Sequence, residues 1–370
     1  MPKAPLRFAI IGAGHIAQSA VIPAFSHPNT QATLTAMLSD DEEKRRQLSR
    51  RHHLIATWPE AALDEALRSD VFDALYIATP NHLHLAQASA ALRAGIHVLL
   101  EKPLTVDEAE AKRLLRLAEA SSAKLMVAYR LHCDPFYVGA LQRVRDGAIG
   151  EPRFMTASFS MQLTPGNVRS LPAAKGGGPL HDLGIYCINA ARSLFRSEPL
   201  AVQAMANAGH DRRSQQVAEM VSVTLRFPGG CLASFTVSFA ASSTGWYQIV
   251  GTTGSLCLDT AFNTSGTRTL EQTTGGRTRT STQAIGDQFA AEIAYFTTCV
   301  RQRRIPEPGV HEGLRDMRVV DAIRKALSSG KTVPLMPLPS RRGARKTMTS
   351  SPPRPRTPRL IHVVDPSTSA

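Results

Sequence analysis

The 370-residue sequence has few cysteines and no long apolar run. Its five cysteines are scattered and odd in number, and no two have Cys-x-x-Cys spacing, which argues against a disulfide scaffold or a structural zinc site. We expect no metal. No stretch approaches about 18 consecutive apolar residues, which excludes a transmembrane helix. No charged leader with an apolar region precedes the first strand-like segment, so we expect a cytoplasmic protein with no membrane partner.

Positive charge is unevenly distributed along the chain. The formal net charge is +13, but residues 340–370 contribute seven Lys/Arg against one Asp, about half of that excess. Pro, Ser, Thr and Arg dominate residues 338–370, which predicts a disordered basic tail. The aromatic residues are not interleaved with the basic run and no recognition motif is present, so we do not expect nucleic acid as a partner.

Strand-like and helix-like patterns alternate through the first 130 residues. This alternation predicts right-handed βαβ units and a parallel sheet buried on both faces. The expected strands are residues 6–11, 32–38, 71–78, 97–100 and 124–128, and the expected helices are residues 15–25, 42–52, 83–94 and 106–120.

The pattern changes after about residue 150, where segments rich in Ser, Thr, Val and Phe predict an antiparallel sheet that is open on one face. The expected strands are residues 153–162, 218–227, 231–239 and 247–251, with a hairpin turn at 227–231 and helices at 180–194, 288–301 and 309–328. We therefore expect a second, α+β domain at residues 131–337.

A glycine motif follows the first predicted strand. Gly12-Ala13-Gly14-His15-Ile16-Ala17 matches G-x-G-x-x-A at a strand-to-helix junction. The first glycine permits the tight turn, the second lets a pyrophosphate approach the backbone, and the small Ala17 allows close helix packing. The helix N-terminus then offers backbone amides to the phosphates. The motif predicts a Rossmann dinucleotide-binding domain at residues 1–130, and the fold class is therefore α/β.

The end of the second strand is expected to contact the adenosine ribose. An acidic residue there favours NAD, because its carboxylate accepts a hydrogen bond from the 2′-hydroxyl; hydroxyl and basic groups favour NADP. The chain carries both kinds, with Asp40 suited to NAD and with Ser39 and Lys44 suited to NADP. The alternative for Lys44 is a solvated helix face.

Two further segments carry candidate chemistry. Glu101-Lys102-Pro103 follows the fourth strand, at the sheet edge where ligands of doubly wound folds bind. Three glycines at 176–178 lead into a helix on which Asp182, Tyr186 and Asn189 share one face, with spacings i, i+4 and i+7. A polar stripe on an otherwise apolar helix predicts a lined cavity; the alternative is a capped helix with a solvated edge.

Together these motifs resemble the glucose–fructose oxidoreductase/inositol dehydrogenase (Gfo/Idh/MocA) family. The resemblance covers roughly residues 5–337 and is closest to the branch of glucose–fructose oxidoreductase and of dihydrodiol and xylose dehydrogenases. It implies an NAD(P)-dependent oxidoreductase acting on the CH–OH group of a sugar or polyol. NADP is the implied cofactor, with NAD as the alternative, because Asp40 stands where that branch often has glycine.

The resemblance also implies roles for individual residues. The implied cofactor-binding residues are Gly12, Gly14, His15, Ile16, Ala17, Ser39, Asp40, Lys44, Thr79, Pro80, Asn81, His82, Glu101, Lys102, Tyr129 and Arg130. The implied catalytic residues are Lys102, Asp182 and Tyr186, and these three with Arg169 are the candidate substrate contacts. The Lys102–Pro103 bond is cis in many relatives.

The chemistry of the residues agrees with this assignment. Removing a hydride from an alcohol requires a group that takes the hydroxyl proton. Tyrosine is a poor base at neutral pH, and a neighbouring ammonium favours its phenolate. We therefore expect Tyr186 to be the acid/base, Lys102 to assist it, and Asp182 to position the substrate.

The alternative function is a non-catalytic, nucleotide-binding regulatory protein of the same fold. Lys102, Asp182 and Tyr186 argue against it, because a regulator does not need them. The open sheet of the second domain would expose an apolar face in a monomer, so we also predict a homodimer or homotetramer formed through it.

Overall fold

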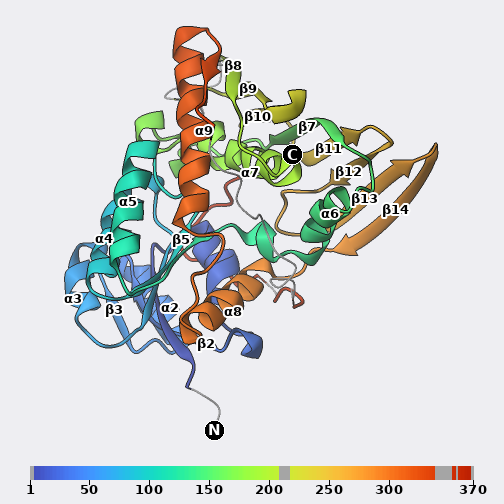
Figure 1. Ribbon diagram of the computed structural model, residues 1–370. Coiled ribbons are helices and arrows are strands. Elements are labelled where there is room, and N and C mark those ends of the chain that lie inside the picture. Colours follow the sequence, from blue (N-terminus) through green and yellow to red (C-terminus); the bar gives the residue numbers. More distant parts are fainter. Residues whose placement is uncertain (1–3, 208–216, 338–351, 356, 368–370) are drawn as a thin grey trace. The chain divides into compact units, whose positions relative to one another are not determined.

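The computed structural model describes residues 4–207, 217–337, 352–355 and 357–367. Within these residues the chain forms two compact units, whose elements are labelled in Figure 1. Unit 1 comprises residues 4–133, 286–314 and 352–365, and unit 2 comprises residues 134–285, 315–337 and 366–367, with the gap positions left out. Among the described residues, no helix combines the length and apolarity needed to cross a membrane.

Unit 1 is built on a six-stranded parallel sheet with strand order β3-β2-β1-β4-β5-β6. Its strands are β1 (Leu6–Ile11), β2 (Ala32–Leu38), β3 (Ala56–Trp58), β4 (Ala74–Ile77), β5 (His97–Glu101) and β6 (Leu125–Ala128). The five strands predicted from the sequence are present. The short β3 was not predicted, because three half-buried residues carry too little apolar pattern.

Helices connect these strands. They are η1 (Ala17–Val21), α1 (Ile22–Ala24), η2 (Pro28–Thr30), α2 (Glu42–His52), η3 (Glu60–Ala62), α3 (Leu63–Leu67), η4 (Asn81–Leu83), α4 (His84–Arg93), α5 (Glu108–Ala120) and η5 (Arg130–Cys133). Aspartates begin α2 and α5: Asp41 accepts a hydrogen bond from the Lys44 amide, and Asp107 accepts one from the Glu110 amide.

Helix α8 (Gln288–Arg301) belongs to unit 1, although the sequence placed residues 131–337 together in the second domain. Phe289, Ile293 and Phe296 lie in the hydrophobic core of unit 1, and the ring of Phe296 lies 6.0 Å from that of Phe8 in β1. The chain thus returns to unit 1 after forming most of unit 2. Local patterns could not reveal this, because they do not say which sheet a helix covers.

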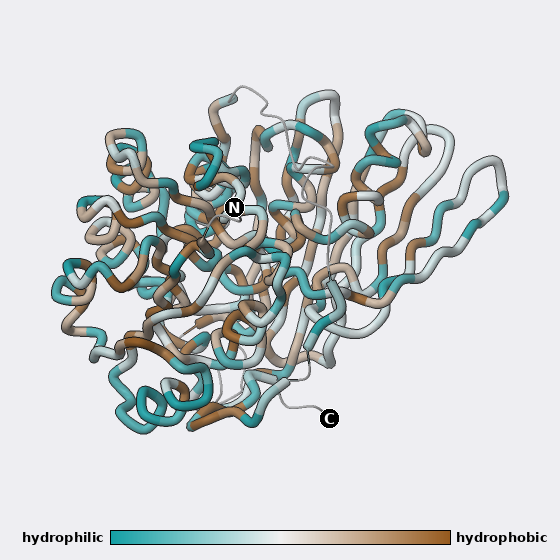
Figure 2. The backbone as a smooth tube through the Cα atoms, turned by 90° about the horizontal axis from the view of Figure 1, so that it is seen from below, coloured by the Kyte–Doolittle hydropathy of each residue, from teal (hydrophilic) through white to brown (hydrophobic). Residues whose placement is uncertain are grey.

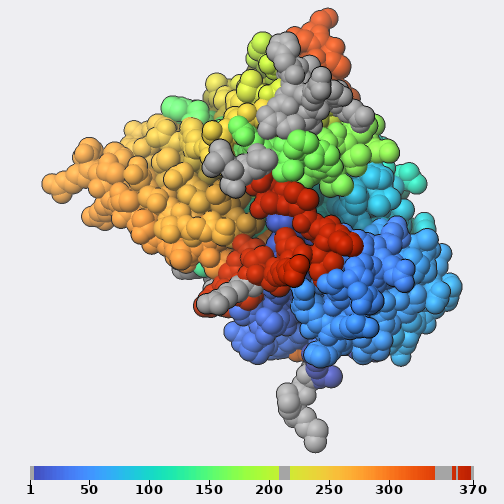
Figure 3. Space-filling view, turned by 180° about the vertical axis from the view of Figure 1, so that it is seen from behind, coloured from blue at the N-terminus to red at the C-terminus, as the bar shows by residue number. Residues whose placement is uncertain are grey.

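The C-terminal segment differs from the expectation of a disordered tail at 338–370. Residues 338–351, 356 and 368–370 lie outside the described part, but the remaining residues have defined contacts. Ile361 is buried in the core of unit 1, and Figure 3 shows this segment in red against the N-terminal residues in blue. In unit 2, the Thr164 amide donates to the carbonyl of Pro366 at 3.0 Å. The basic, proline-rich composition concealed Ile361, whose buried side chain anchors the segment.

Unit 2 contains a nine-stranded sheet with strand order β14-β13-β12-β11-β7-β10-β9-β8-β15, in which β7 and β10 form the one parallel pair. Its strands are β7 (Pro152–Ser160), β8 (Ala201–Asn207), β9 (Met220–Arg226), β10 (Leu232–Ser238), β11 (Thr244–Gly251), β12 (Gly254–Asp259), β13 (Thr267–Thr274), β14 (Arg277–Ala284) and β15 (Val333–Pro334). Its helices are α6 (Pro135–Arg145), η6 (Val168–Ser170), η7 (Ala173–Lys175), η8 (Leu180–Gly184), α7 (Ile185–Phe195), η10 (Pro228–Gly230) and α9 (Val310–Ser329), whose first turn belongs to unit 1.

The predicted hairpin between β9 and β10 is present, with the Phe227 amide donating to the carbonyl of Cys231. The sequence reading missed β8, β12 and the β13–β14 hairpin. That hairpin is mostly exposed and is coloured as hydrophilic in Figure 2, at the far right in both ribbon and tube views. β13 pairs with both β12 and β14 and buries Leu270, whereas β14 is almost wholly exposed, so the apolar signal in this hairpin is weak.

The central strands of this sheet have one buried and one open face. In β10, Ala233, Phe235 and Val237 are buried, while Ser234 and Thr236 lie on the other face. The open face is largely a Ser/Thr surface. It also carries the paired residues Phe154 and Leu232, each 44% exposed.

A buried ionic network stabilises unit 2. Arg192 in α7 forms ion pairs with Asp316 in α9 and with Glu198, which also pairs with Arg315 at 2.7 Å. Asp316 is fully buried and also accepts a hydrogen bond from Asn189 at 3.1 Å. The network compensates charges that would otherwise be costly in the interior.

Replacing Asp316 with alanine is expected to destabilise the protein by about 3–5 kcal/mol, because a buried guanidinium loses a partner. Asp321→Ala, on the same helix and paired with the more exposed Arg324, is the matched control and is expected to cost about 0–1 kcal/mol. Urea unfolding measures both. Equal costs would show that Asp316 does not hold the network together.

Candidate active site

The glycine motif lies where β1 meets η1. Gly12 has a φ of +89°, and a Cβ there would lie 2.7 Å from the carbonyl oxygen of Ala78 at the end of β4. A Cβ at Gly14 would meet no atom within 4 Å, so the backbone is open to a ligand at this point. The Gln18 amide donates to the Gly14 carbonyl at 3.1 Å, so the helical turn begins directly after the second glycine. This arrangement fits the pyrophosphate of a dinucleotide.

The segment after β2 orients the groups expected to contact the ribose. The Asp40 carboxylate accepts a hydrogen bond from the Glu60 amide at 2.8 Å, which engages the group that would favour NAD. The Lys44 ammonium lies 3.8 Å from Asp41, and its side chain is largely buried. Ser39 is buried directly after β2. The arrangement leaves Ser39 and Lys44 as the phosphate-favouring pair.

Two loops at the ends of β4 and β5 are joined by His84. Its two ring nitrogens lie 3.0 Å from the Thr79 carbonyl oxygen and 2.9 Å from that of Pro103. The residue is fully buried, and burial lowers the pKa of His84 to about 4. The ring therefore lies between the loop of Thr79, Pro80, Asn81 and His82 and the loop of Lys102, and when neutral it donates to one of the two carbonyls. His84 was not predicted as a site residue, because the sequence shows it only as an ordinary residue at the start of a helix.

The Lys102–Pro103 peptide bond is cis. The preceding Glu101 is buried and accepts a hydrogen bond from the Tyr76 hydroxyl at 2.9 Å. Burial raises the pKa of Glu101, and the charges of Lys102 and Arg130 and the Tyr76 hydrogen bond oppose this. These contacts hold Glu101 inside the sheet edge, with Lys102, which is only partly buried, next to it.

Tyr129 and Arg130 follow β6 and are buried. The Arg130 guanidinium donates to the Gln288 side chain at 2.6 Å. One turn further along α8, Glu292 is fully buried, and burial together with the charge of Glu101 raises its pKa well above the ordinary value, against the opposing charge of Arg130. Gln288 and Glu292 were not identified from the sequence, because α8 is distant along the chain from the sites it supports.

In unit 2, three glycines position an ion pair. Gly178 has a φ of +98°, and its amide donates to the Arg169 carbonyl at 2.8 Å. Arg169 Nε lies 2.8 Å from Asp182 Oδ2, so two of the four predicted substrate contacts form an ion pair. Their side chains are 26% and 14% exposed, which leaves them partly accessible.

Tyr186 lies one helical turn after Asp182, at the start of α7. Its ring packs edge-on against Phe159, with 5.6 Å between the centroids, and at 6.1 Å from Phe262. These aromatic contacts fix the direction of the side chain. Asn189 is not part of the expected polar stripe, because it is buried against Asp316 in the ionic network. The stripe is therefore limited to Asp182 and Tyr186.

Comparison with known proteins identifies the family. Residues 6–129 match an oxidoreductase family with an NAD-binding Rossmann fold, and residues 137–257 match the GFO/IDH/MocA C-terminal domain. The chain is 30% identical over 334 residues to D-xylose 1-dehydrogenase (NADP(+)) 2 of Haloferax volcanii, covering 89% of this chain and 100% of that protein. The chain belongs to the Gfo/Idh/MocA oxidoreductase family.

Two other proteins that are similar to this Gfo/Idh/MocA oxidoreductase are named for other sugar substrates. A dTDP-3,4-didehydro-2,6-dideoxy-alpha-D-glucose 3-reductase of Actinomadura kijaniata is 31% identical over 324 residues, covering 86% of this chain and 95% of the relative. The crystal structure of an aldose-aldose oxidoreductase from Caulobacter crescentus with glycerol has a TM-score of 0.83 at 29% identity, covering 90% and 100% of the two chains.

These findings confirm the resemblance, the fold class and the oxidoreductase assignment. The candidate cofactor residues all lie in unit 1, and Arg169, Asp182 and Tyr186 lie in unit 2. The roles of the individual residues stay predictions. Among the residues that the structure describes, no cluster of His, Cys, Asp and Glu could hold a metal ion.

The buried Glu292 predicts a specific pH dependence of stability. Because its folded pKa is raised, the folded protein keeps a proton that the unfolded chain loses above about pH 4.5, so stability falls as the pH rises beyond that value. Glu292→Gln removes this loss. We expect the variant to gain more stability over the wild type at pH 8 than at pH 5, measured by urea unfolding.

Glu151→Gln, at a side chain that is 79% exposed, is the control and is expected to change stability equally at both pH values. If Glu292→Gln behaved like this control, the carboxyl at 292 would be ionised in the folded protein.

Proposed function

We propose that this protein is an NADP-dependent oxidoreductase that transfers a hydride between an alcohol carbon of a sugar or polyol and the nicotinamide. The proposal depends chiefly on the backbone at Gly14, which is open to a ligand at the end of a strand of the Rossmann sheet. The same chain also carries the Arg169–Asp182 ion pair and Tyr186, whose ring packs against Phe159. The relatives named for sugar oxidation and reduction support the same substrate class.

The choice of NADP rests on the groups after β2. Asp40 is engaged by a backbone amide, while Ser39 and Lys44 offer a hydroxyl and a cation for a 2′-phosphate. The relative from Haloferax volcanii is named for NADP. NAD is the alternative that cofactor titration distinguishes.

In this proposal each residue has a limited task. A bound NADP would supply a hydride acceptor, so that the alcohol carbon of the substrate could become a carbonyl. Tyr186 takes the hydroxyl proton on its phenolic oxygen and returns it in the reverse direction. We expect Lys102 to assist Tyr186, and Asp182, held by Arg169, accepts hydrogen bonds from neighbouring sugar hydroxyls.

Tyr186→Phe tests this assignment. The substitution keeps the ring against Phe159 and Phe262 but removes the proton acceptor, so kcat with NADP and a panel of aldoses is expected to fall about 10²-fold or more. The dissociation constant for NADP should not change. Tyr295→Phe removes a phenol outside the proposed site and should keep full turnover.

Unchanged turnover in Tyr186→Phe would remove Tyr186 from the mechanism. If the wild type bound neither NADP nor NAD, the enzyme function itself would be wrong.

Assembly and location remain predictions. We propose a homodimer or homotetramer formed through the open face of the unit 2 sheet, because Phe154 and Leu232 lie opposite each other there and are partly exposed. A cytoplasmic location is likewise still the prediction from the sequence.

Light scattering at micromolar concentration is expected to give the mass of a dimer or tetramer. The double variant Phe154→Lys/Leu232→Lys should shift it toward the monomer, because it places charges in the apolar contact. Ile305→Lys, at a residue that is 80% exposed in unit 1, is the control and should keep the assembly. A monomeric wild type would contradict the proposed interface.

A further inference from the structure

The C-terminal residues 357–365 lie against the glycine motif and the start of α2. Neither family match, 6–129 or 137–257, includes this segment. Besides the buried Ile361 side chain, hydrogen bonds to its backbone hold it in place. The Gln18 side chain donates to the Ile361 carbonyl at 3.0 Å and accepts from the Ile361 amide at 2.8 Å. The same side-chain amide donates to the Ala13 carbonyl at 3.0 Å. One buried glutamine therefore ties the segment to the glycine motif.

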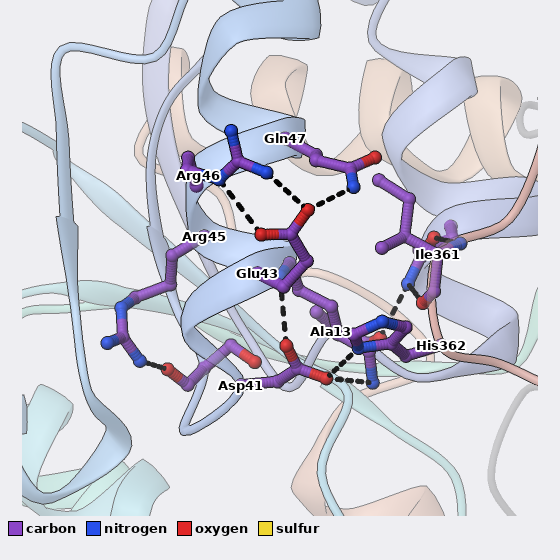
Figure 4. A network of polar contacts seen from close by, with 11 residues as sticks. Ala13, Asp41, Glu43, Arg45, Arg46, Gln47, Ile361 and His362 are labelled. Carbon is purple, nitrogen blue, oxygen red and sulfur yellow. Dashed lines mark hydrogen bonds and ion pairs between the residues drawn. The ribbon is translucent and has the colours of Figure 1, made fainter.

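His362, which follows Ile361, lies beside the start of α2, where the adenosine ribose of the cofactor is expected. His362 Nδ1 lies 2.9 Å from Asp41 Oδ2, and Figure 4 shows the ring beside Asp41 and Ala13. The His362 side chain is 60% exposed, so its ring is accessible to a ligand. On the other side of Ile361, Arg51 donates to the Arg359 carbonyl at 2.7 Å, which fixes the direction of the segment along α2.

A carboxylate at Asp41 would repel a 2′-phosphate unless nearby positive groups offset its charge. Burial raises the pKa of Asp41, but the hydrogen bonds from the Lys44 amide and from His362, with the charges of both side chains, outweigh it and lower the pKa overall. Asp41 is therefore anionic at neutral pH. The other nearby acid, Glu43, is paired with Arg46. An anionic Asp41 repels a 2′-phosphate, and Lys44 and His362 are the groups in contact with it that offset this repulsion.

We propose that the C-terminal segment is part of the cofactor site and that His362 is a residue that determines its preference for NADP over NAD. This rests on the proposed function, because it requires a dinucleotide whose ribose lies at the end of β2. His362 donates to Asp41 and adds positive character beside the 2′-phosphate. NAD lacks that phosphate, so its binding does not depend on His362.

The test is equilibrium dialysis of the full-length protein with NADP and, separately, with NAD at pH 6.5. His362→Ala is expected to raise the dissociation constant for NADP about five- to tenfold, the scale of one charge-assisted contact, and to change that for NAD less than about twofold. His362→Lys places an ammonium group at this position and is expected to keep the preference for NADP.

His53→Ala is the matched control. His53 ends the same helix and is also an exposed histidine with positive φ, +52° against +48° for His362, so the two alanine variants carry a similar backbone cost. This control should bind both cofactors as the wild type does, and thermal unfolding of all variants should agree.

The outcomes separate the two proposals. If the wild type binds NADP and His362→Ala keeps its preference, or loses affinity for both cofactors equally, the role of His362 is overturned while the proposed function stands. If the wild type binds neither cofactor, both are overturned.

Discussion

The close approach between the ends of β1 and β4 is the constraint on which the rest of unit 1 depends. A Cβ at Gly12 would lie 2.7 Å from the Ala78 carbonyl oxygen, which is too close for a non-bonded contact between a Cβ carbon and an oxygen. Glycine therefore lets the two strand ends meet, and its positive φ directs the chain into η1. A side chain here would displace the loop that carries Thr79, and with it the contact through His84 to Pro103. The turn at Gly12, the loop of Thr79 and the loop of Pro103 in the proposed cofactor site therefore all depend on the absence of a side chain at position 12.

The acidic side chains of unit 1 lie in two different electrostatic environments, one around Glu101 and Glu292 and the other around Asp41. Around Glu101 and Glu292 the groups are buried, and burial favours neutral carboxyls. Around Asp41 the groups are more accessible, and backbone and cationic partners keep the carboxylate ionised. The first arrangement keeps negative charge out of the interior of unit 1. The second suits recognition of a charged group by balanced electrostatics.

Much of the fold was predictable, because its signals are local. The glycine motif, the buried strands and the helix at 42–52 depend on residues close in sequence, and the structure has them where expected. Long-range relations were not predictable. The assignment of α8 to unit 1, the pairing of Asn189 with Asp316 and the burial of Ile361 each join residues more than 100 positions apart. In the tail, a proline- and arginine-rich composition concealed the apolar Ile361.

The return of the chain to unit 1 has a consequence for synthesis. The core of unit 1 contains Phe8 near one end of the chain, Phe296 from α8, and Ile361 near the other end. On a ribosome, the core of unit 1 therefore stays incomplete until the segment that carries Ile361 has emerged. Unit 2, whose sheet is drawn largely from one continuous stretch, has nearly all its strands available earlier. The order in which the halves mature is thus expected to be the reverse of their order in the gene.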